Sequence, residues 1–291
     1  AKLAVRNIPS VIRYRYYSRW LTYLFPLTMT DNKIMRSFLF GILLVFTCLL
    51  AGCDNSPSGK TYLVATDATL VPMSFMSAGN DITGFEPDLI RAVAKEAGID
   101  IHIINVEWAG LFGGLITRKF DMVISSVTVL EERKERMAFG EPYLKSGLAL
   151  VVRKNQEGIN SFADAKKNNF LIGAQIGTTA YFFLEKDPGV RKKGYQMYGH
   201  AVADLINGEI DAVLGESTGT LFYKNQNKPL FEKIKMVGEI MTNEHYAIVF
   251  HKEDTELLEK INSALQKILK DGTLARLHKK WDLGMSAQVP E

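Results

Sequence analysis

The sequence predicts an α/β fold made of two similar lobes. From Lys60 onward, short apolar runs with the length of buried strands alternate with segments whose apolar residues recur at helical spacing. A ten-residue pattern also occurs twice, 90 residues apart, at residues 115–124 and 205–214: Leu-Ile, three variable residues, an apolar residue, Asp, any residue, Val and an apolar residue. In both copies we expect a helix to end, the Asp to make the turn and a buried strand to begin. Ligands of open α/β sheets lie outside the carboxyl ends of the strands, so two facing lobes would enclose a cleft.

The first 52 residues are expected to lie outside the folded domain. Residues 1–34 are rich in Arg and Tyr without a clear period, and from Met35 the sequence has the pattern of a secretory signal, with Arg36 ahead of an apolar run that ends at Leu50. This run is shorter than the about 20 residues that a membrane-spanning helix needs. Its end, Leu50-Ala51-Gly52-Cys53, resembles the lipobox of bacterial lipoproteins, which implies that Cys53 is lipidated and starts the mature chain. The alternative is a chance Cys at the end of a membrane anchor.

Charge and cysteine content exclude several classes of protein. The whole chain has a formal net charge of +3, but seven Lys and Arg residues and one Asp lie in residues 1–52, which leaves 28 positive and 31 negative residues, a net charge of −3. No basic face for nucleic acid is therefore implied. The two Cys residues are Cys48, inside the signal, and Cys53. The exported domain has none for a disulfide or a thiolate metal site.

Strands and helices of the exported part can be placed from their start and stop signals. Pro87 near a helix start and Gly98 just past its end indicate a helix between them, and Gly272 is expected to stop a long amphipathic helix that caps the domain. That helix has an apolar side of Leu258, Ile261, Leu265, Ile268 and Leu269. The expected elements are strands at 62–65, 101–106, 122–124 and 148–152, and helices at 88–97, 108–117 and 255–270.

The stretch from Asp121 to Arg136 carries the first functional signal. A buried, parallel strand is followed by the hydroxyl cluster Ser125, Ser126 and Thr128. Thr128-Val-Leu-Glu131 fits a capping box, which predicts a helix from about Val129. Free amides at that helix start, together with Arg133 one turn in, would suit a carboxylate. The other interpretation is an ordinary strand-to-helix turn with a solvated charged face.

Enzyme and metal motifs are weak. Residues 215–219, Gly-Glu-Ser-Thr-Gly, match the nucleophile-elbow pattern of serine hydrolases, and Asp254 and His278 follow, but no Gly-rich oxyanion loop precedes Ser217. The five His residues are scattered without metal-ligand spacing, and there is no phosphate-binding Gly loop. We expect no metal, no cofactor and no catalytic residue.

Several short motifs occur together in one order along the chain. They are Leu63-Val-Ala-Thr-Asp67, Val71-Pro72, Gly84-Phe-Glu-Pro-Asp-Leu89, Phe120-Asp-Met-Val-Ile-Ser-Ser-Val-Thr128, Glu132-Arg133, Gly272-Thr273 and Lys280-Trp281. In this combination the sequence resembles the periplasmic polar-amino-acid-binding proteins of ABC importers, over essentially all of residues 60–284. The resemblance implies a two-lobed periplasmic-binding-protein fold, two similar α/β lobes joined by two hinge strands near 148–153 and 245–250.

The resemblance also implies roles for residues. Arg133, with Thr128 and the backbone near Ser126 and Thr179, would hold the α-carboxylate of a free amino acid, and Glu216 with Ser126 would meet its α-ammonium. The side-chain pocket would be lined by Asp67 and Trp108, with Gln175 across the cleft. The expected ligand-binding set is Asp67, Leu70, Trp108, Ser125, Ser126, Thr128, Arg133, Gln175, Thr178, Thr179 and Glu216.

Two positions depart from the family pattern and affect ligand choice. Glu216 stands where Asp is usual, and Leu70 stands where an aromatic residue is usual. Asp67 follows the first strand without a neighbouring Lys or Arg, so we expect an unpaired carboxylate that favours a cationic side chain, with glutamine second and acidic amino acids last. A few relatives with this fold are dehydratases acting on cyclohexadienyl acids, so a dehydratase remains the alternative function, with a serine hydrolase using Ser217 behind it.

The expected organisation follows from these features. The protein is expected to be a monomeric receptor, lipid-anchored at the periplasmic side of the inner membrane, that passes its amino acid to ABC permease subunits. The chain divides into an upstream segment (1–34) outside the mature protein, a lipoprotein signal peptide (35–52), a linker (53–60), the first part of lobe 1 (61–150), lobe 2 (151–244) and a return to lobe 1 with the C-terminal helices (245–291).

Overall fold

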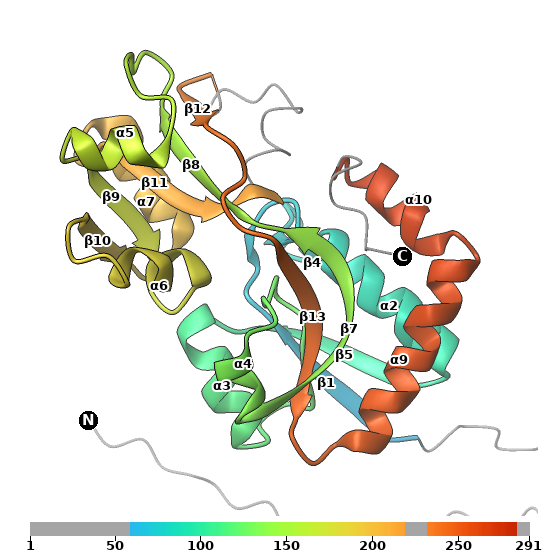
Figure 1. Cartoon of the computed structure of the whole chain (residues 1–291). Helices are drawn as coiled ribbons and strands as arrows, with labels where there is room; N and C mark the ends of the chain where they lie inside the picture. The colour runs from blue at the N-terminus through green and yellow to red at the C-terminus, as the bar shows by residue number, and fades with distance from the viewer. Residues whose placement is uncertain (1–58, 219–231, 284–291) are drawn as a thin grey trace, which may run out of the picture. The chain divides into compact units, whose positions relative to one another are not determined.

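The computed structural model describes residues 59–218 and 232–283 (Figure 1). The predicted signal peptide, Cys53 and most of the predicted linker lie outside the described residues. No helix in the described ranges is long and apolar enough to cross a membrane.

The first lobe is built on a five-stranded sheet with the order β5-β1-β6-β13-β7 (Figure 1). Strand β1 runs parallel to β5 and β6, while β13 is antiparallel to both β6 and β7. A small sheet of β2, β3 and β4 adjoins it. The strands are β1 (Thr61–Thr66), β2 (Thr69–Leu70), β3 (Ser74–Met76), β4 (Ile82–Thr83), β5 (Asp100–Asn105), β6 (Met122–Val123), β7 (Met137–Ser146) and β13 (Glu244–His251). The helices are α2 (Phe85–Ala97), α3 (Trp108–Ile116), α4 (Glu131–Lys134), α9 (Thr255–Lys270) and α10 (Thr273–Lys280).

The second lobe repeats this arrangement with a second five-stranded sheet, in the order β10-β9-β11-β8-β12. Strand β9 runs parallel to β10 and β11, and β8 is antiparallel to β11 and β12. The elements are β8 (Leu148–Arg153), α5 (Phe162–Lys167), β9 (Leu171–Gln175), α6 (Thr179–Glu185), β10 (Arg191–Tyr195), α7 (Tyr198–Asn207), β11 (Ala212–Glu216) and β12 (Ile234–Val237). The predicted α/β fold with two similar lobes is confirmed.

The sequence repeat has a structural cause. In the first lobe, the amide of Leu63 donates to Asp121 Oδ2 at 2.8 Å, and in the second the amide of Leu171 donates to Asp211 Oδ2 at 2.9 Å. In each case the amide of the Asp donates back to the carbonyl of the same residue. Each Asp therefore ties the central strand of its sheet, which it precedes, to the neighbouring parallel strand, β1 or β9, which explains why Asp occupies the same place in both copies.

The predicted helices need three corrections, one to the start of α2 and two to the apolar face of α9. Helix α2 begins at Phe85 rather than at residue 88, with Pro87 inside its first turn, where its missing N–H breaks no helical bond. Helix α9 has the predicted limits and packs against α2 and β7 (Figure 1). Its buried face is made by Leu257, Ile261, Ala264, Leu265 and Ile268, whereas Leu269 is 42% exposed. Leu258 is only partly buried. Gly272 stops the helix as predicted, because it has a left-handed φ of 75° directly after the cap residue Asp271.

The chain crosses between the two sheets twice. The first crossing is at Gly147, between β7 and β8, and the second is the segment 238–243, between β12 and β13. The two crossings are bonded to each other, because the amide of Leu148 donates to Thr242 Oγ1 at 2.9 Å. A Cβ on residue 147 would lie 2.1 Å from the carbonyl oxygen of Thr242, so only glycine fits there.

These crossings shift the predicted hinges. The segments 148–153 and 245–250 were expected to run between the lobes, but β8 lies wholly in the second sheet and β13 wholly in the first. The division placed between residues 150 and 151 therefore falls inside β8, and the crossing lies a few residues earlier.

Candidate functional site

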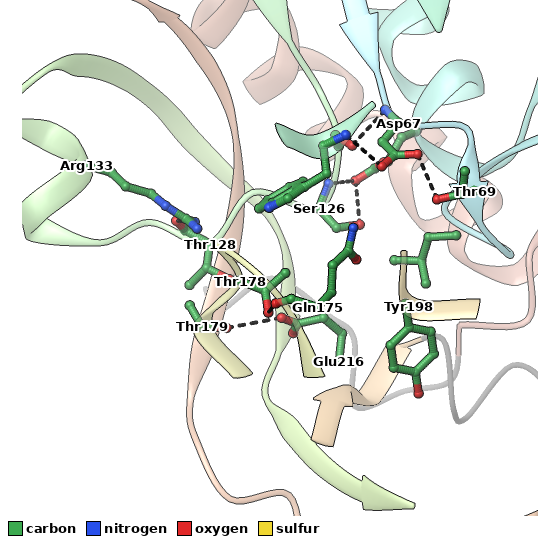
Figure 2. Close-up of a pocket in the computed structure, with 14 residues that line it drawn as sticks. Asp67, Thr69, Ser126, Thr128, Arg133, Gln175, Thr178, Thr179, Tyr198 and Glu216 are labelled. Carbon is green, nitrogen blue, oxygen red and sulfur yellow. Dashed lines mark hydrogen bonds between the residues drawn. The ribbon is translucent and has the colours of Figure 1, made fainter. Parts of the chain in front are cut away.

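One cavity is lined by residues from both lobes (Figure 2). It holds about 520 Å³ of empty space, a figure that includes the solvent at its mouth. All eleven residues of the predicted ligand-binding set lie on its wall, together with three that were not predicted. The lining residues are Asp67, Thr69, Leu70, Glu86, Trp108, Ser125, Ser126, Thr128, Arg133, Gln175, Thr178, Thr179, Tyr198 and Glu216.

Arg133 supplies the buried cation of this wall. Its side chain is only 9% exposed, and its guanidinium lies over the rings of Phe112 and Trp108, 5.0 and 5.7 Å from their centroids. Nη1 donates to the carbonyl of Thr128 at 2.9 Å, and Nη2 donates to the carbonyl of Gly177 in the second lobe at 3.0 Å. Burial lowers the pKa of Arg133 to about 10, so it stays charged at neutral pH. Two aromatic faces and two carbonyls hold the guanidinium in one plane.

The predicted capping box at Thr128 does not form. Helix α4 begins at Glu131, and its cap Leu130 makes no side-chain bond. Thr128 instead forms an antiparallel bridge with Tyr246 of β13, and its hydroxyl donates to Glu244 Oε2 at 2.8 Å. Pairing with a distant strand has overridden the local capping signal, and the helix that carries Arg133 begins two residues later than predicted.

Asp67 lies at the end of β1 and is not unpaired, contrary to the prediction. Its Oδ1 accepts from the Thr69 hydroxyl at 2.7 Å and its Oδ2 from the amide of Trp108, the first residue of α3, at 2.9 Å. Its own amide donates to Ser125 Oγ at 3.0 Å. Burial nevertheless raises the pKa of Asp67. In the part of the chain that the structure describes, no Lys or Arg forms an ion pair with it.

Glu216 ends β11 and is bonded across to the first lobe. Its Oε2 accepts from the hydroxyls of Tyr246 at 2.8 Å and Ser146 at 3.4 Å. Burial, and then the nearby carboxylate of Glu244, raise the pKa of Glu216 to about 8. Glu216 is therefore mostly protonated at neutral pH in this structure.

Glu244 is a second acidic residue of this region that the sequence did not reveal. Its Oε2 accepts from the hydroxyls of Thr128 and Thr179 at 2.8 and 2.9 Å, and its Oε1 from Thr242 at 2.7 Å. The hydroxyl of Thr179 also lies 3.1 Å from Glu216 Oε1. A hydroxyl has one hydrogen, so a proton on Glu216 is what lets all these oxygens be satisfied at once.

Glu86 is the least expected member of the wall. It is 0% exposed, and its Oε1 accepts from the Ser126 amide at 2.5 Å, the Ser126 hydroxyl at 3.0 Å and the Tyr143 hydroxyl. These bonds hold Ser126 at a φ of 50°, which non-glycine residues rarely adopt. Burial raises the pKa of Glu86 to about 7. The sequence did indicate that Glu86 is buried, because it precedes Leu89 and Val93 by three and seven residues and so lies on the buried face of α2.

The remaining lining residues shape the second-lobe side. The Thr178 hydroxyl accepts from the amide of Tyr181 and caps α6, and Gln175 Nε2 donates to the carbonyl of Gln196. The ring of Tyr198, at the start of α7, packs against Gly215 so closely that a Cβ on residue 215 would lie 2.3 Å from the ring. Thr69 and Tyr198 lacked any motif that could have identified them.

The nucleophile-elbow interpretation is wrong. Gly215 is explained by the packing of Tyr198, and Ser217 is only 2% exposed, with its hydroxyl 3.5 Å from that of Ser146. Asp254 pairs with Arg118 at 2.8 Å, while the ring of His278 packs on Phe85. The contacts of the described residues assemble no Ser-His-Asp triad, and no group of three His, Cys, Asp or Glu side chains among them could hold a metal ion.

A fold of two similar lobes with a polar cavity between their sheets defines a binding protein for a small polar solute. The chain belongs to the bacterial extracellular solute-binding proteins, family 3, whose family model matches residues 62–285. It is 31% identical over 223 residues to the L-cystine-binding protein TcyJ of Escherichia coli strain K12, covering 76% of this chain and 82% of that protein.

Two solved structures are also similar. An ancestral arginine-binding protein bound to arginine is 36% identical, with a TM-score of 0.71 over 76% of this chain and 97% of that one. The ancestral amino acid-binding protein AncCDT-1, a precursor of cyclohexadienyl dehydratase, is 32% identical, with a TM-score of 0.70 over 76% of this chain and 95% of that one. These likenesses confirm the predicted periplasmic-binding-protein fold.

Proposed function

We propose that this chain is the receptor of an ABC importer, which binds an amino acid with a cationic side chain in the cavity and delivers it to the membrane permease subunits. The observation that carries the proposal is the charge of the cavity wall. The wall has one buried guanidinium, that of Arg133, and three carboxyl groups, those of Asp67, Glu86 and Glu216. An amino acid with one carboxylate and two cationic groups complements this set, because each ligand charge would meet an opposite one.

Arg133 would bind the α-carboxylate. A planar guanidinium suits a bidentate carboxylate, and Phe112 and Trp108 already hold its plane. The carbonyl of Gly177 accepts from Nη2 in the present structure, so the ligand would take this donor over. Thr128, Thr178 and Thr179 lie on the same wall and would complete the carboxylate subsite.

Ser126 and Glu216 would meet the α-ammonium. In Figure 2 Arg133 lies at one end of the labelled group, Asp67, Thr69 and Tyr198 lie at the other, and Ser126, Gln175 and Glu216 lie between. A ligand carboxylate on Arg133 would therefore place its α-carbon in the middle. An ammonium there favours the ionised form of Glu216, whose pKa of about 8 leaves it protonated in the free protein at neutral pH.

The ligand side chain would then reach Asp67, Thr69, Leu70 and Tyr198, with Trp108 nearby. Asp67 accepts two hydrogen bonds but has no cationic partner among the described residues, and its buried carboxylate would be stabilised by one. Trp108 could add a ring face for the cation. Arginine and lysine therefore rank first and glutamine second, and glutamate ranks last because it would set two carboxylates against each other.

Cystine is the competing ligand. TcyJ is named as an L-cystine-binding protein, and the second ammonium of cystine could also reach Asp67. Its second carboxylate would need a second cation, and Arg133 is the one Lys or Arg on the described wall. We therefore place cystine behind the cationic amino acids.

We propose binding without turnover. The dehydratase alternative is favoured only by the similarity to AncCDT-1, a precursor of cyclohexadienyl dehydratase. A protonated Glu216 could act as an acid, but the same group serves an ammonium equally well. Incubation of the protein with a cyclohexadienyl acid, followed by NMR, is expected to show no product, and measurable turnover would overturn this part of the proposal.

The protein is further proposed to be a monomer held at the periplasmic face of the inner membrane by lipid on Cys53. The sequence Leu50-Ala51-Gly52-Cys53 supports the anchor. The proposed function is tested by a thermal-shift screen of the twenty amino acids and cystine, followed by calorimetry of the best ligands. Arginine or lysine should stabilise the protein most, and a largest effect from glutamate or an apolar amino acid would overturn the proposal.

A further inference from the structure

Glu86 Oε2 is a buried carboxyl oxygen that accepts no hydrogen bond from the described residues. Four buried side-chain polar atoms in the described residues have no hydrogen-bond partner, on Thr66, Ser74, Glu86 and His278. Of these four residues, Glu86 alone lines the cavity. A buried carboxyl oxygen without a donor is strongly disfavoured, so the missing donor is most simply a group that enters the cavity.

The hydroxyls nearest to Glu86 cannot supply that donor. Ser126 already donates its hydroxyl and its amide to Oε1 of the same carboxyl group, and Tyr143 donates to Oε1 as well. On the rest of the wall, Thr69 donates to Asp67, while Thr128 donates to Glu244. None of these groups donates to Oε2, which leaves this oxygen available to a donor on a bound ligand.

An α-ammonium has the chemistry needed to donate a hydrogen bond to Glu86 Oε2. A primary ammonium has three N–H donors, and in a closed cleft each needs an acceptor. Glu216 is one acceptor, and Ser126 Oγ is a second, because its own hydrogen is directed to Glu86. Glu86 Oε2, on the carboxyl group bonded to Ser126, is placed to be the third.

We propose that Glu86 is a ligand-binding residue whose Oε2 accepts a hydrogen bond from the primary α-ammonium of the bound amino acid. The inference rests on the proposed function in that the ligand is an amino acid, but it does not depend on which side chain is bound. It also implies a preference for primary over secondary ammonium groups, so proline and N-methylated amino acids should bind poorly.

The charged state of Glu86 gives this contact a measurable signature. Tyr143 from β7 and Ser126 contact the carboxyl group, the His278 ring of α10 packs on the adjacent Phe85, and the cavity also presents Asp67, Arg133 and Glu216. Burial holds the pKa of Glu86 at about 7, so at pH 6 it is mostly protonated. An ammonium on Oε2 would ionise it, and the proton would be released.

The experiment is calorimetric titration at pH 6 in two buffers of different ionisation enthalpy, which counts the protons released on binding. The ligand is the amino acid that stabilises the wild-type protein most. Glu86→Gln keeps the size of the side chain and the acceptor for Ser126 and Tyr143. We expect its affinity to fall at least tenfold and its proton release to fall by about one, since Glu216 still releases its own. A smaller fall in affinity, or an unchanged proton count, overturns the contact.

Two further variants separate binding from folding. Tyr143→Phe removes a donor that favours the ionised form of Glu86 but leaves Oε2 in place, so it should weaken binding less than Glu86→Gln does. If Glu86→Gln does not fold, Glu216→Gln is used, which removes the other titrating carboxyl group and should still release about one proton at pH 6. Release of none overturns the inference. A wild-type protein that binds no amino acid overturns the proposed function itself.

Discussion

Replacing Arg133 by Ala tests how the cavity recognises a carboxylate. In the wild-type protein the buried guanidinium makes two hydrogen bonds and stacks on Phe112 and Trp108. Without it, a bound carboxylate would be buried with no cation and with Glu216 and Glu244 nearby. Breaking a buried ion pair in this way costs roughly 3–5 kcal/mol, and about 1.4 kcal/mol is tenfold in affinity. We therefore expect Arg133→Ala to weaken binding by roughly two to three and a half orders of magnitude.

The assay is calorimetry with arginine and lysine, with circular dichroism to check the fold. Arg136→Ala is the matched control, because Arg136 is exposed three residues away and lines no part of the ligand cavity. It removes the same charge and should leave the dissociation constant within about twofold of wild type. Arg133→Ala binding within threefold of wild type would refute the carboxylate assignment. An equal loss in both variants would show a general electrostatic effect instead of a contact.

Three further predictions follow from the structure and the sequence. Asp67→Asn should lower arginine affinity by roughly ten- to a hundredfold, the size of a charge-assisted hydrogen bond, and lower glutamine affinity much less; equal losses by calorimetry would exclude a side-chain cation at Asp67. Because the pKa of Glu216 is raised to about 8 from an ordinary 4.5, the folded state binds more protons than the unfolded state between these values, so this group's stabilisation is present at low pH and lost as pH rises through 8. The melting temperature of the unliganded protein should fall from pH 6 to pH 9, and a Glu216→Gln variant with the same slope would contradict the cause given. Cys53→Ser should release the processed protein from membranes on fractionation, and a variant still membrane-bound after processing would show that lipid on Cys53 is not the anchor.

The fold was largely predictable because its signals are local. The two Asp turns repeat at a fixed spacing, and each Asp bonds the strand next to the one it precedes, β1 in the first sheet and β9 in the second. The limits of α9 followed from its periodic apolar residues, although Leu269 was placed on the wrong face. The start of α4 was not predictable, because Thr128 pairs with Tyr246, 118 residues along the chain, and that contact leaves no local signal.

The candidate site was predictable only where it resembled a family pattern. The eleven residues expected from that resemblance line one cavity, but their hydrogen bonds depend on distant partners. Asp67 was expected to be unpaired because one of its donors, the amide of Trp108, is 41 residues away, while the nearby Thr69 hydroxyl belongs to no motif. Glu244 gained its place from three hydroxyls supplied by both lobes and the crossing between them. The position of Glu86 on an apolar helix face indicates a buried carboxyl group, but the resemblance to a family motif alone assigns it no contact with the ligand.

The measurement that tests the central proposal most directly is calorimetric titration of the wild-type protein and Asp67→Asn with arginine, lysine, glutamine, glutamate and cystine. We expect arginine or lysine to bind wild type most tightly and glutamate to bind least, and the preference for the cationic ligands over glutamine to shrink in Asp67→Asn. Tightest binding of glutamate or cystine, or an unchanged preference in the variant, would contradict it.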